Sequence, residues 1–120
     1  MATKKQNSKK GNIAKRESKV NPKTLSKALR ALKSRFATED VKKMSEIPDE
    51  YVTGTQFALG LGYDTMIKRF YDPKFLTIED LLNVSDITGT DVEIIAKLAL
   101  KEAKETHEKR DITQLLIDDH

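Results

Sequence analysis

The stretch that decides the fold runs from Thr53 to Phe75 and reads TGTQFALGLGYDTMIKRFYDPKF. Its apolar residues follow two helical patterns in succession. The first pattern places Phe57, Ala58 and Leu61 on one helix face, and Gly62 supplies the permissive backbone expected where that helix ends. The stretch therefore predicts two short helices joined by a glycine-containing turn.

The second pattern begins directly after the turn. Its apolar face is formed by Tyr63, Ile67, Phe70 and Tyr71. The small Ala58 allows this second helix to pack closely across the first, as a helix-turn-helix requires. Thr65, Lys68 and Arg69 fall on the opposite face, where they would be available to a groove of DNA.

Residues 53–98 resemble the lambda-repressor-like (Cro/repressor type) helix-turn-helix domain. The resemblance is carried by the blocks F-A-L-x-L-G, I-K-R-F, D-P-K-F-L-T-I-E-D-L-L and I-T-G-T-D-V-E-I-I. Counted from Gly62, the family's aliphatic residue in the recognition helix falls at Lys68, so Ile67 takes that role and the turn is one residue shorter. The resemblance implies an all-α fold and DNA binding through the second helix.

Five polar residues of this region are predicted DNA contacts. Thr65, Lys68 and Arg69 would face base edges or nearby phosphates, Gln56 would bond the DNA backbone, and Lys74 would add a phosphate contact. Ordinary surface polarity is the alternative for all five. Residues 53–98 hold four basic and seven acidic side chains, a net charge of −3. We therefore expect most of the affinity for DNA to come from elsewhere in the chain.

Positive charge is concentrated at the start of the sequence. Residues 1–36 carry twelve Lys or Arg against the single acid Glu17, a net charge of +11, whereas the remaining residues sum to −8. A basic arm on an acidic body favours a polyanionic partner, although a solubilising tail has the same composition. The predicted phosphate contacts are Lys4, Lys5, Lys9, Lys10, Lys15, Arg16, Lys19, Lys23, Lys27 and Arg30.

The remaining patterns are helical. Asn21-Pro22 is typical of a helix start, Thr38 is expected to begin a short helix to Ser45, and Thr77 with Asp80 forms a near-capping box. Helix starts are also indicated at Thr90-Asp-Val-Glu. We predict an all-α fold, a compact bundle of five to six short helices, with three parts. These are a disordered basic arm at 1–20, a helical domain at 21–100 with its helix-turn-helix at 55–72, and a charged helical extension at 101–120.

The extension ends in a small apolar stripe of Ile112, Leu115 and Leu116. Such a stripe needs cover. It either packs back on the domain or forms a homodimer or partner-protein contact.

Chemistry of an enzymatic kind is not indicated. The sequence has no cysteine, and neither His107 nor His120 has metal-ligand spacing to another strong ligand. We expect no catalytic residues, no cofactor and no metal. No apolar run approaches the length of a membrane span, so we expect a cytoplasmic protein without a membrane partner.

The leading hypothesis from the sequence is a small DNA-binding protein, a bacterial or phage transcriptional regulator that uses a helix-turn-helix and a basic arm. It would be associated with the nucleoid. The alternative is a structural component of a phage or other nucleoprotein particle, in which the helix-turn-helix serves as a packing module. A third class, an antitoxin-like protein, depends only on the C-terminal stripe.

Overall fold

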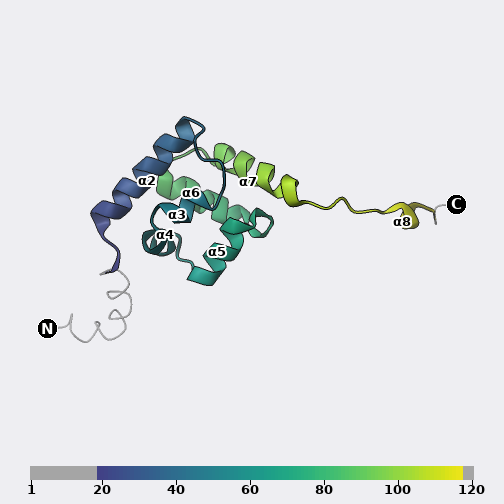
Figure 1. Cartoon of the computed structure of the whole chain (residues 1–120), viewed down its shortest axis with the longest axis horizontal. Helices are drawn as coiled ribbons and strands as arrows, with labels where there is room; N and C mark the ends of the chain where they lie inside the picture. Colours follow the sequence, from purple (N-terminus) through teal and green to yellow (C-terminus); the bar gives the residue numbers. More distant parts are fainter. Residues whose placement is uncertain (1–18, 118–120) are drawn as a thin grey trace.

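The computed structural model describes residues 19–117, and this part of the chain is all-helical with no strand. Figure 1 shows the helices as one body from which α7 and the C-terminal segment extend. The all-α prediction is confirmed. The elements are α2 (Pro22–Ala37), α3 (Glu46–Glu50), α4 (Val52–Leu59), α5 (Tyr63–Tyr71), the 3-10 helix η1 (Pro73–Phe75), α6 (Ile78–Thr88), α7 (Val92–Thr106) and α8 (Thr113–Ile117).

Helix α2 begins as its sequence predicts. The Asn21 side chain accepts hydrogen bonds from the backbone N–H groups of Lys23 (2.9 Å) and Thr24 (3.2 Å), which would otherwise lack partners at a helix start. Pro22 occupies the first helical position, where a missing N–H carries no penalty. The helix ends at Ala37, and the chain then reverses through Glu39, a non-glycine residue with φ of 57°.

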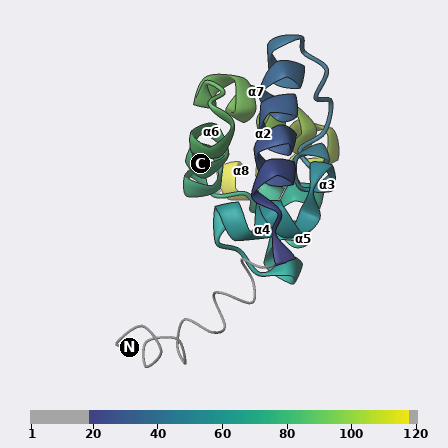
Figure 2. The same ribbon diagram turned by 90° about the vertical axis from the view of Figure 1, so that its left-hand side faces the viewer.

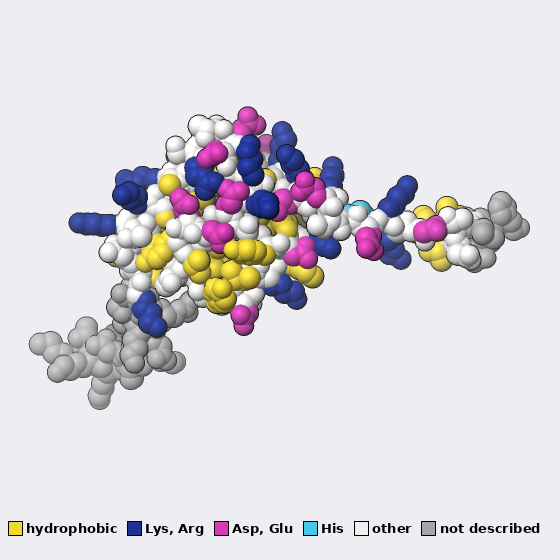
Figure 3. Space-filling model, viewed as in Figure 1, with side chains coloured by type: hydrophobic (Ala, Val, Ile, Leu, Met, Phe, Trp, Pro, Cys, Tyr) yellow, Lys and Arg dark blue, Asp and Glu magenta, His cyan; other side chains and the backbone are white. Residues whose placement is uncertain are grey.

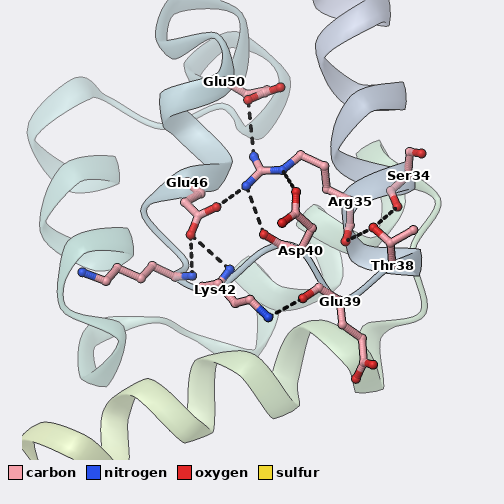
Figure 4. Close-up of polar contacts among 9 residues, drawn as sticks. Ser34, Arg35, Thr38, Glu39, Asp40, Lys42, Glu46 and Glu50 are labelled. Atoms are coloured by element: carbon pink, nitrogen blue, oxygen red, sulfur yellow. Dashed lines mark hydrogen bonds and ion pairs between the residues drawn. The ribbon is translucent and has the colours of Figure 1, made fainter.

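The segment after α2 is a loop held by one arginine (Figure 4). Arg35 pairs with Asp40 (3.3 Å), Glu50 (3.5 Å) and Glu46. Partial burial opposes its charged form, but the hydrogen bonds to Glu46 and Asp40 outweigh this and raise the pKa of Arg35. The second carboxylate oxygen of Glu46 accepts the backbone N–H groups of residues 42 and 43. The predicted helix over residues 38–45 is therefore wrong, because side chains bond the backbone of this loop.

The helix-turn-helix stretch folds into α4 and α5, but its turn differs from the expectation. Gly60 adopts the left-handed conformation with φ of 66°, and the Leu61 N–H bonds the Gln56 carbonyl at 3.1 Å. Gly62 is extended with φ of −69° and starts α5. The first helix thus ends two residues earlier than predicted.

The core lies where α5 meets the other helices. Met66 and Phe70 of α5 are fully buried, and burial of side chains this large contributes about 1.5–3 kcal/mol each. Phe70 was expected inside and Met66 was not. Tyr63 and Tyr71 were expected inside but are each 53% exposed. The other core residues are Leu32, Phe36, Val41, Met44, Ile47, Leu59, Val84, Ile95 and Ala99.

Helix α6 has the predicted start and end. The Thr77 side chain accepts from the Asp80 N–H (3.0 Å), the Asp80 carboxylate accepts from the Thr77 N–H (2.9 Å), and Gly89 ends the helix with φ of 70°. Helix α7 is capped by Asp91, which accepts from the N–H of residue 93. The predicted cap Thr90 is instead buried.

Helix α7 leads away from the body, and α8 follows after an exposed linker. Asp111 starts α8 by accepting the Thr113 N–H at 2.9 Å, and the side-chain and backbone bonds from Thr113 lower the pKa of Asp111. The described chain therefore enters the body at α2, beside α4 and α5 in Figure 2, and leaves it at the end of α7.

Candidate nucleic-acid interface

Residues 19–21, which precede α2, are held against α4 and against Tyr51, the N-cap residue of α4. Val20 is only 6% exposed, and Lys19 and Val20 line a shallow groove of about 270 Å³ with Thr53, Gln56 and Phe57 of α4. The Tyr51 hydroxyl accepts the Asn21 N–H (2.9 Å) and donates to the Lys19 carbonyl (3.3 Å). The last two residues of the predicted arm, expected to be disordered, are therefore ordered and seated beside Gln56, one of the predicted DNA contacts.

Gly54 makes room for this seat. A Cβ at Gly54 would lie 2.5 Å from Cδ2 and 2.7 Å from Cε2 of Tyr51, and 3.0 Å from Cδ1 of Leu25. A side chain there would displace the Tyr51 ring. Sequence reasoning missed Tyr51, because a contact between a hydroxyl and a backbone some thirty residues away leaves no periodic signal.

Three predicted phosphate contacts form one exposed stripe on α2. Lys23, Lys27 and Arg30 stand at positions i, i+4 and i+7, and all three are exposed. Figure 3 shows basic side chains at the left edge of the molecule, where α2 lies in Figure 1. Within residues 19–117 the ion pairs involve only Arg35 and Arg69, so no carboxylate of that range pairs with this stripe. Lys19 is exposed close to its start.

Arg69 is partly buried and forms an ion pair with Asp80. Its NH1 group lies 3.0 Å and 3.2 Å from the two carboxylate oxygens of Asp80, whose side chain is 5% exposed against 30% for Arg69. The same carboxylate caps α6 through the Thr77 N–H. Arg69 thus ties α5 to the start of α6. No sequence pattern indicates this pair, because the two residues belong to different helices.

The other predicted contacts near α5 are exposed. Thr65 and Lys68 are on α5, and Lys74 is on η1. The Lys68 ammonium lies 4.7 Å from the centre of the Phe75 ring, a cation–π distance. Asp64 on α5 is exposed as well, so positive potential on this helix is weak.

An apolar area adjoins these residues, and Figure 3 shows it at the lower centre, over α4 and α5. Exposed aromatic side chains of these helices are Phe57 (37%), Tyr63 and Tyr71. The Tyr71 hydroxyl donates to Asp49 of α3, and this hydrogen bond raises the pKa of Tyr71. This face differs in character from the basic stripe on α2.

Several predicted residues lie outside the described part of the chain or away from the motif. The arm residues Lys4, Lys5, Lys9, Lys10, Lys15 and Arg16 lie outside it. Ile112, Leu115 and Leu116 are all exposed, so this stripe does not pack back on the domain in the structure.

Within residues 19–117, no group of three or more His, Asp or Glu side chains is arranged to hold a metal ion. None of the helices in that range combines the length and the apolar character needed to cross a membrane.

Comparison with protein families, with curated proteins and with solved structures returns no match for this chain. The resemblance to the helix-turn-helix domain therefore rests on the motif residues alone.

Proposed function

We propose that this protein binds DNA, with the basic arm and the α2 stripe supplying affinity and the helix-turn-helix supplying orientation. The observation that carries the proposal is the seat of Lys19 and Val20 against Gln56 of α4. This seat brings the end of a strongly basic segment to the first helix of the motif. A polyanion bound by the arm would therefore pass close to α4 and the stripe.

The physical basis of the affinity is the release of counterions from phosphates. Lys23, Lys27 and Arg30 have no carboxylate partner within residues 19–117, so a phosphate would not have to displace one. Each phosphate contact steepens the salt dependence, with a slope of roughly 0.9 per contact on logarithmic axes. In this proposal the protein is a small bacterial or phage regulator that reads DNA weakly.

Helix α5 supplies the remaining contacts. Thr65 and Lys68 point outward, while Met66 and Phe70 anchor the same helix in the core. A helix held rigidly from behind can present side chains to the major groove. Because Arg69 is engaged with Asp80, base reading would depend on Thr65 and Lys68.

The first experiment is selection from random duplex DNA at two salt concentrations, with the selected sequences read out. It compares the full chain with a chain that begins at Lys19, which keeps the buried Val20 in place. Enrichment of a definite site by both chains is the expected result. If neither chain binds duplex DNA at the lower salt concentration, the proposal is wrong.

A matched pair of triple variants tests whether the α2 stripe itself binds DNA, or whether removing positive charge anywhere in the chain weakens binding equally. Replacing Lys23, Lys27 and Arg30 with Ala should reduce the logarithmic salt slope by about 3. The control replaces the exposed Lys104, Lys109 and Arg110 with Ala, which removes the same residue types from the opposite end of the chain. Equal loss of binding in both variants would contradict a role for the α2 stripe.

A structural component of a nucleoprotein particle is the second candidate. It is favoured by the engagement of Arg69 and by the apolar area on α4 and α5, which suits a protein neighbour better than a base edge. Here Thr65→Ala and Lys68→Ala would leave nucleic-acid binding nearly unchanged. Salt-sensitive binding without any enriched site, lost in the chain that begins at Lys19, would favour this candidate over a regulator.

A further inference from the structure

Helix α8 carries apolar side chains that nothing in the described part of the chain covers. Ile112 is 45% exposed, Leu115 66% and Leu116 55%. The N–H groups of Leu115 (2.9 Å) and Leu116 (3.2 Å) both donate to the Ile112 carbonyl, so one turn gathers the three side chains on one face. In Figure 1 this turn stands apart from the body.

A groove of complementary character lies between α7 and the loop that follows α2. Its apolar lining comes from Phe36, Val41, Ile94 and Leu98, and its volume is about 390 Å³. The loop is held against α7 because the Met44 N–H donates to the Glu102 carboxylate. The groove has room for a few side chains rather than for a whole helix.

Lysines surround this apolar floor, namely Lys42, Lys43, Lys97 and Lys101. The Lys42 ammonium bonds the Glu39 carbonyl at 2.7 Å, and none of the four lysines is in an ion pair within residues 19–117. Three glutamates share the lining, of which Glu102 is engaged by the loop. Four lysines against three glutamates leave the groove with a net charge of +1, because the backbone N–H that bonds Glu102 is uncharged.

We propose that this groove receives α8 of a second copy of this chain. In the sequence the three apolar residues are preceded by Asp111 and followed by Asp118 and Asp119, and the groove combines an apolar floor with lysines. Each copy has one α8 and one groove, so two copies can exchange them reciprocally, and we take the pairing to be this closed two-fold dimer rather than an open chain. This pairing goes beyond DNA binding and does not depend on it.

The tether favours a second copy over the chain's own α8. Ile94 lies twelve residues before the end of α7 at Thr106, which is about 18 Å along a helix axis. The six linker residues 107–112 reach about 20 Å only when they are fully extended. The chain's own α8 would need that extended linker to run back along α7, whereas in Figure 1 it leads away from α7. A second copy is under no such restraint.

Cysteine cross-linking tests the occupant directly, since the sequence contains no cysteine. Ile94→Cys is introduced into one protein and Leu115→Cys into another that carries a mass tag, and the two are mixed without nucleic acid under mild oxidation. A mixed covalent dimer in excess of both same-variant dimers is the expected result. A double variant that closes only within one chain would show that the chain's own α8 fills the groove, and would overturn the proposal.

Sedimentation across a concentration series tests the energetics. Leu115→Asp, and separately Lys97→Glu with Lys101→Glu, should weaken the dimer by about tenfold or more, because each removes apolar or charge complementarity. The control is Lys23→Glu with Lys27→Glu, the same charge change at the same spacing on α2, which should leave the dimer intact. A wild-type chain that stays monomeric, or a dimer indifferent to Leu115→Asp, would refute the pairing. Because no DNA is present, either failure leaves the proposed function untouched.

Discussion

Replacement of Asp80 tests how α5 is fixed to α6. Its carboxylate accepts the Thr77 N–H at 2.9 Å and two contacts from Arg69 at 3.0 Å and 3.2 Å. Asp80→Ala removes all three. Loss of the Thr77 N–H bond costs about 0.5–1.5 kcal/mol, while the Thr77 side chain still accepts the backbone N–H of residue 80. Loss of the ion pair costs about 1 kcal/mol more, a figure kept low because Arg69 is 30% exposed and water can solvate it.

The expected loss in the free energy of unfolding is therefore about 1.5–2.5 kcal/mol, a large share of the roughly 5–15 kcal/mol typical of a small domain. Urea unfolding followed by circular dichroism measures it, with an unchanged m-value as the sign that both states keep their compactness. Glu79→Ala is the matched control. Glu79 is exposed in the same first turn, so its replacement removes only a dipole interaction of about 0.3–1 kcal/mol.

If Asp80→Ala costs no more than Glu79→Ala, the account of this contact is wrong. The partner variant Arg69→Ala extends the test to function. Because Arg69 is engaged with Asp80, its replacement should lower stability and change DNA binding only slightly. An intact free energy of unfolding together with lost sequence preference would instead identify Arg69 as a base-reading residue that leaves Asp80 on binding.

Three further predictions follow from the structure: two concern backbone conformation, and the third concerns the titration of a tyrosine. Gly54→Ala should lower the free energy of unfolding by about 1–2 kcal/mol, because its Cβ would lie 2.5 Å from the Tyr51 ring, and this clash exceeds the gain in helix propensity. Glu39→Gly should raise the free energy of unfolding by about 0.5–1 kcal/mol, because φ of 57° strains a side-chain-bearing residue; thermal denaturation would measure both variants. The raised pKa of Tyr71 means that its hydrogen bond to Asp49 stabilises the fold below the unfolded tyrosine pKa, and that this contribution is lost as pH rises through the higher folded value. Tyrosinate absorbance should show one phenol titrating late, and Asp49→Asn should move it back.

Local sequence signals predicted the helix starts well where a start depends on capping hydrogen bonds between neighbouring residues. The Asn21 cap and the box of Thr77 and Asp80 were readable because a cap needs particular residues only three positions apart. The turn was displaced because two glycines stand two residues apart, and either can end a helix. In the structure Leu59 packs into the core and Gly60 after it is the left-handed residue, which depends on contacts with other helices.

The candidate interface was harder to predict, because its decisive contacts join distant parts of the chain. Arg69 looks like a DNA contact on a helical wheel, and its pairing with Asp80 depends on how α5 meets α6. The same applies to Tyr51, which bonds the backbone on both sides of Val20. Periodicity places a residue on a face, but it does not say which other element covers that face.

The engagement of Arg69 has a consequence for how a regulator of this design would discriminate among DNA sites. A good bidentate contact to a base contributes about 1–3 kcal/mol of discrimination, and Arg is the side chain best suited to it. With Arg69 bonded to Asp80, one copy keeps Thr65 and Lys68, neither of which has the planar fork that such a contact uses. A single copy would then bind many sequences with similar affinity. Pairing through α8 would join a second set of the same contacts to the first, and discrimination would rise while each copy's contacts stay weak. Leu115→Asp should accordingly reduce enrichment of a selected site more than it reduces affinity for random duplex, as competition binding against random DNA would measure. An equal reduction of both would mean that the two copies act only by adding positive charge.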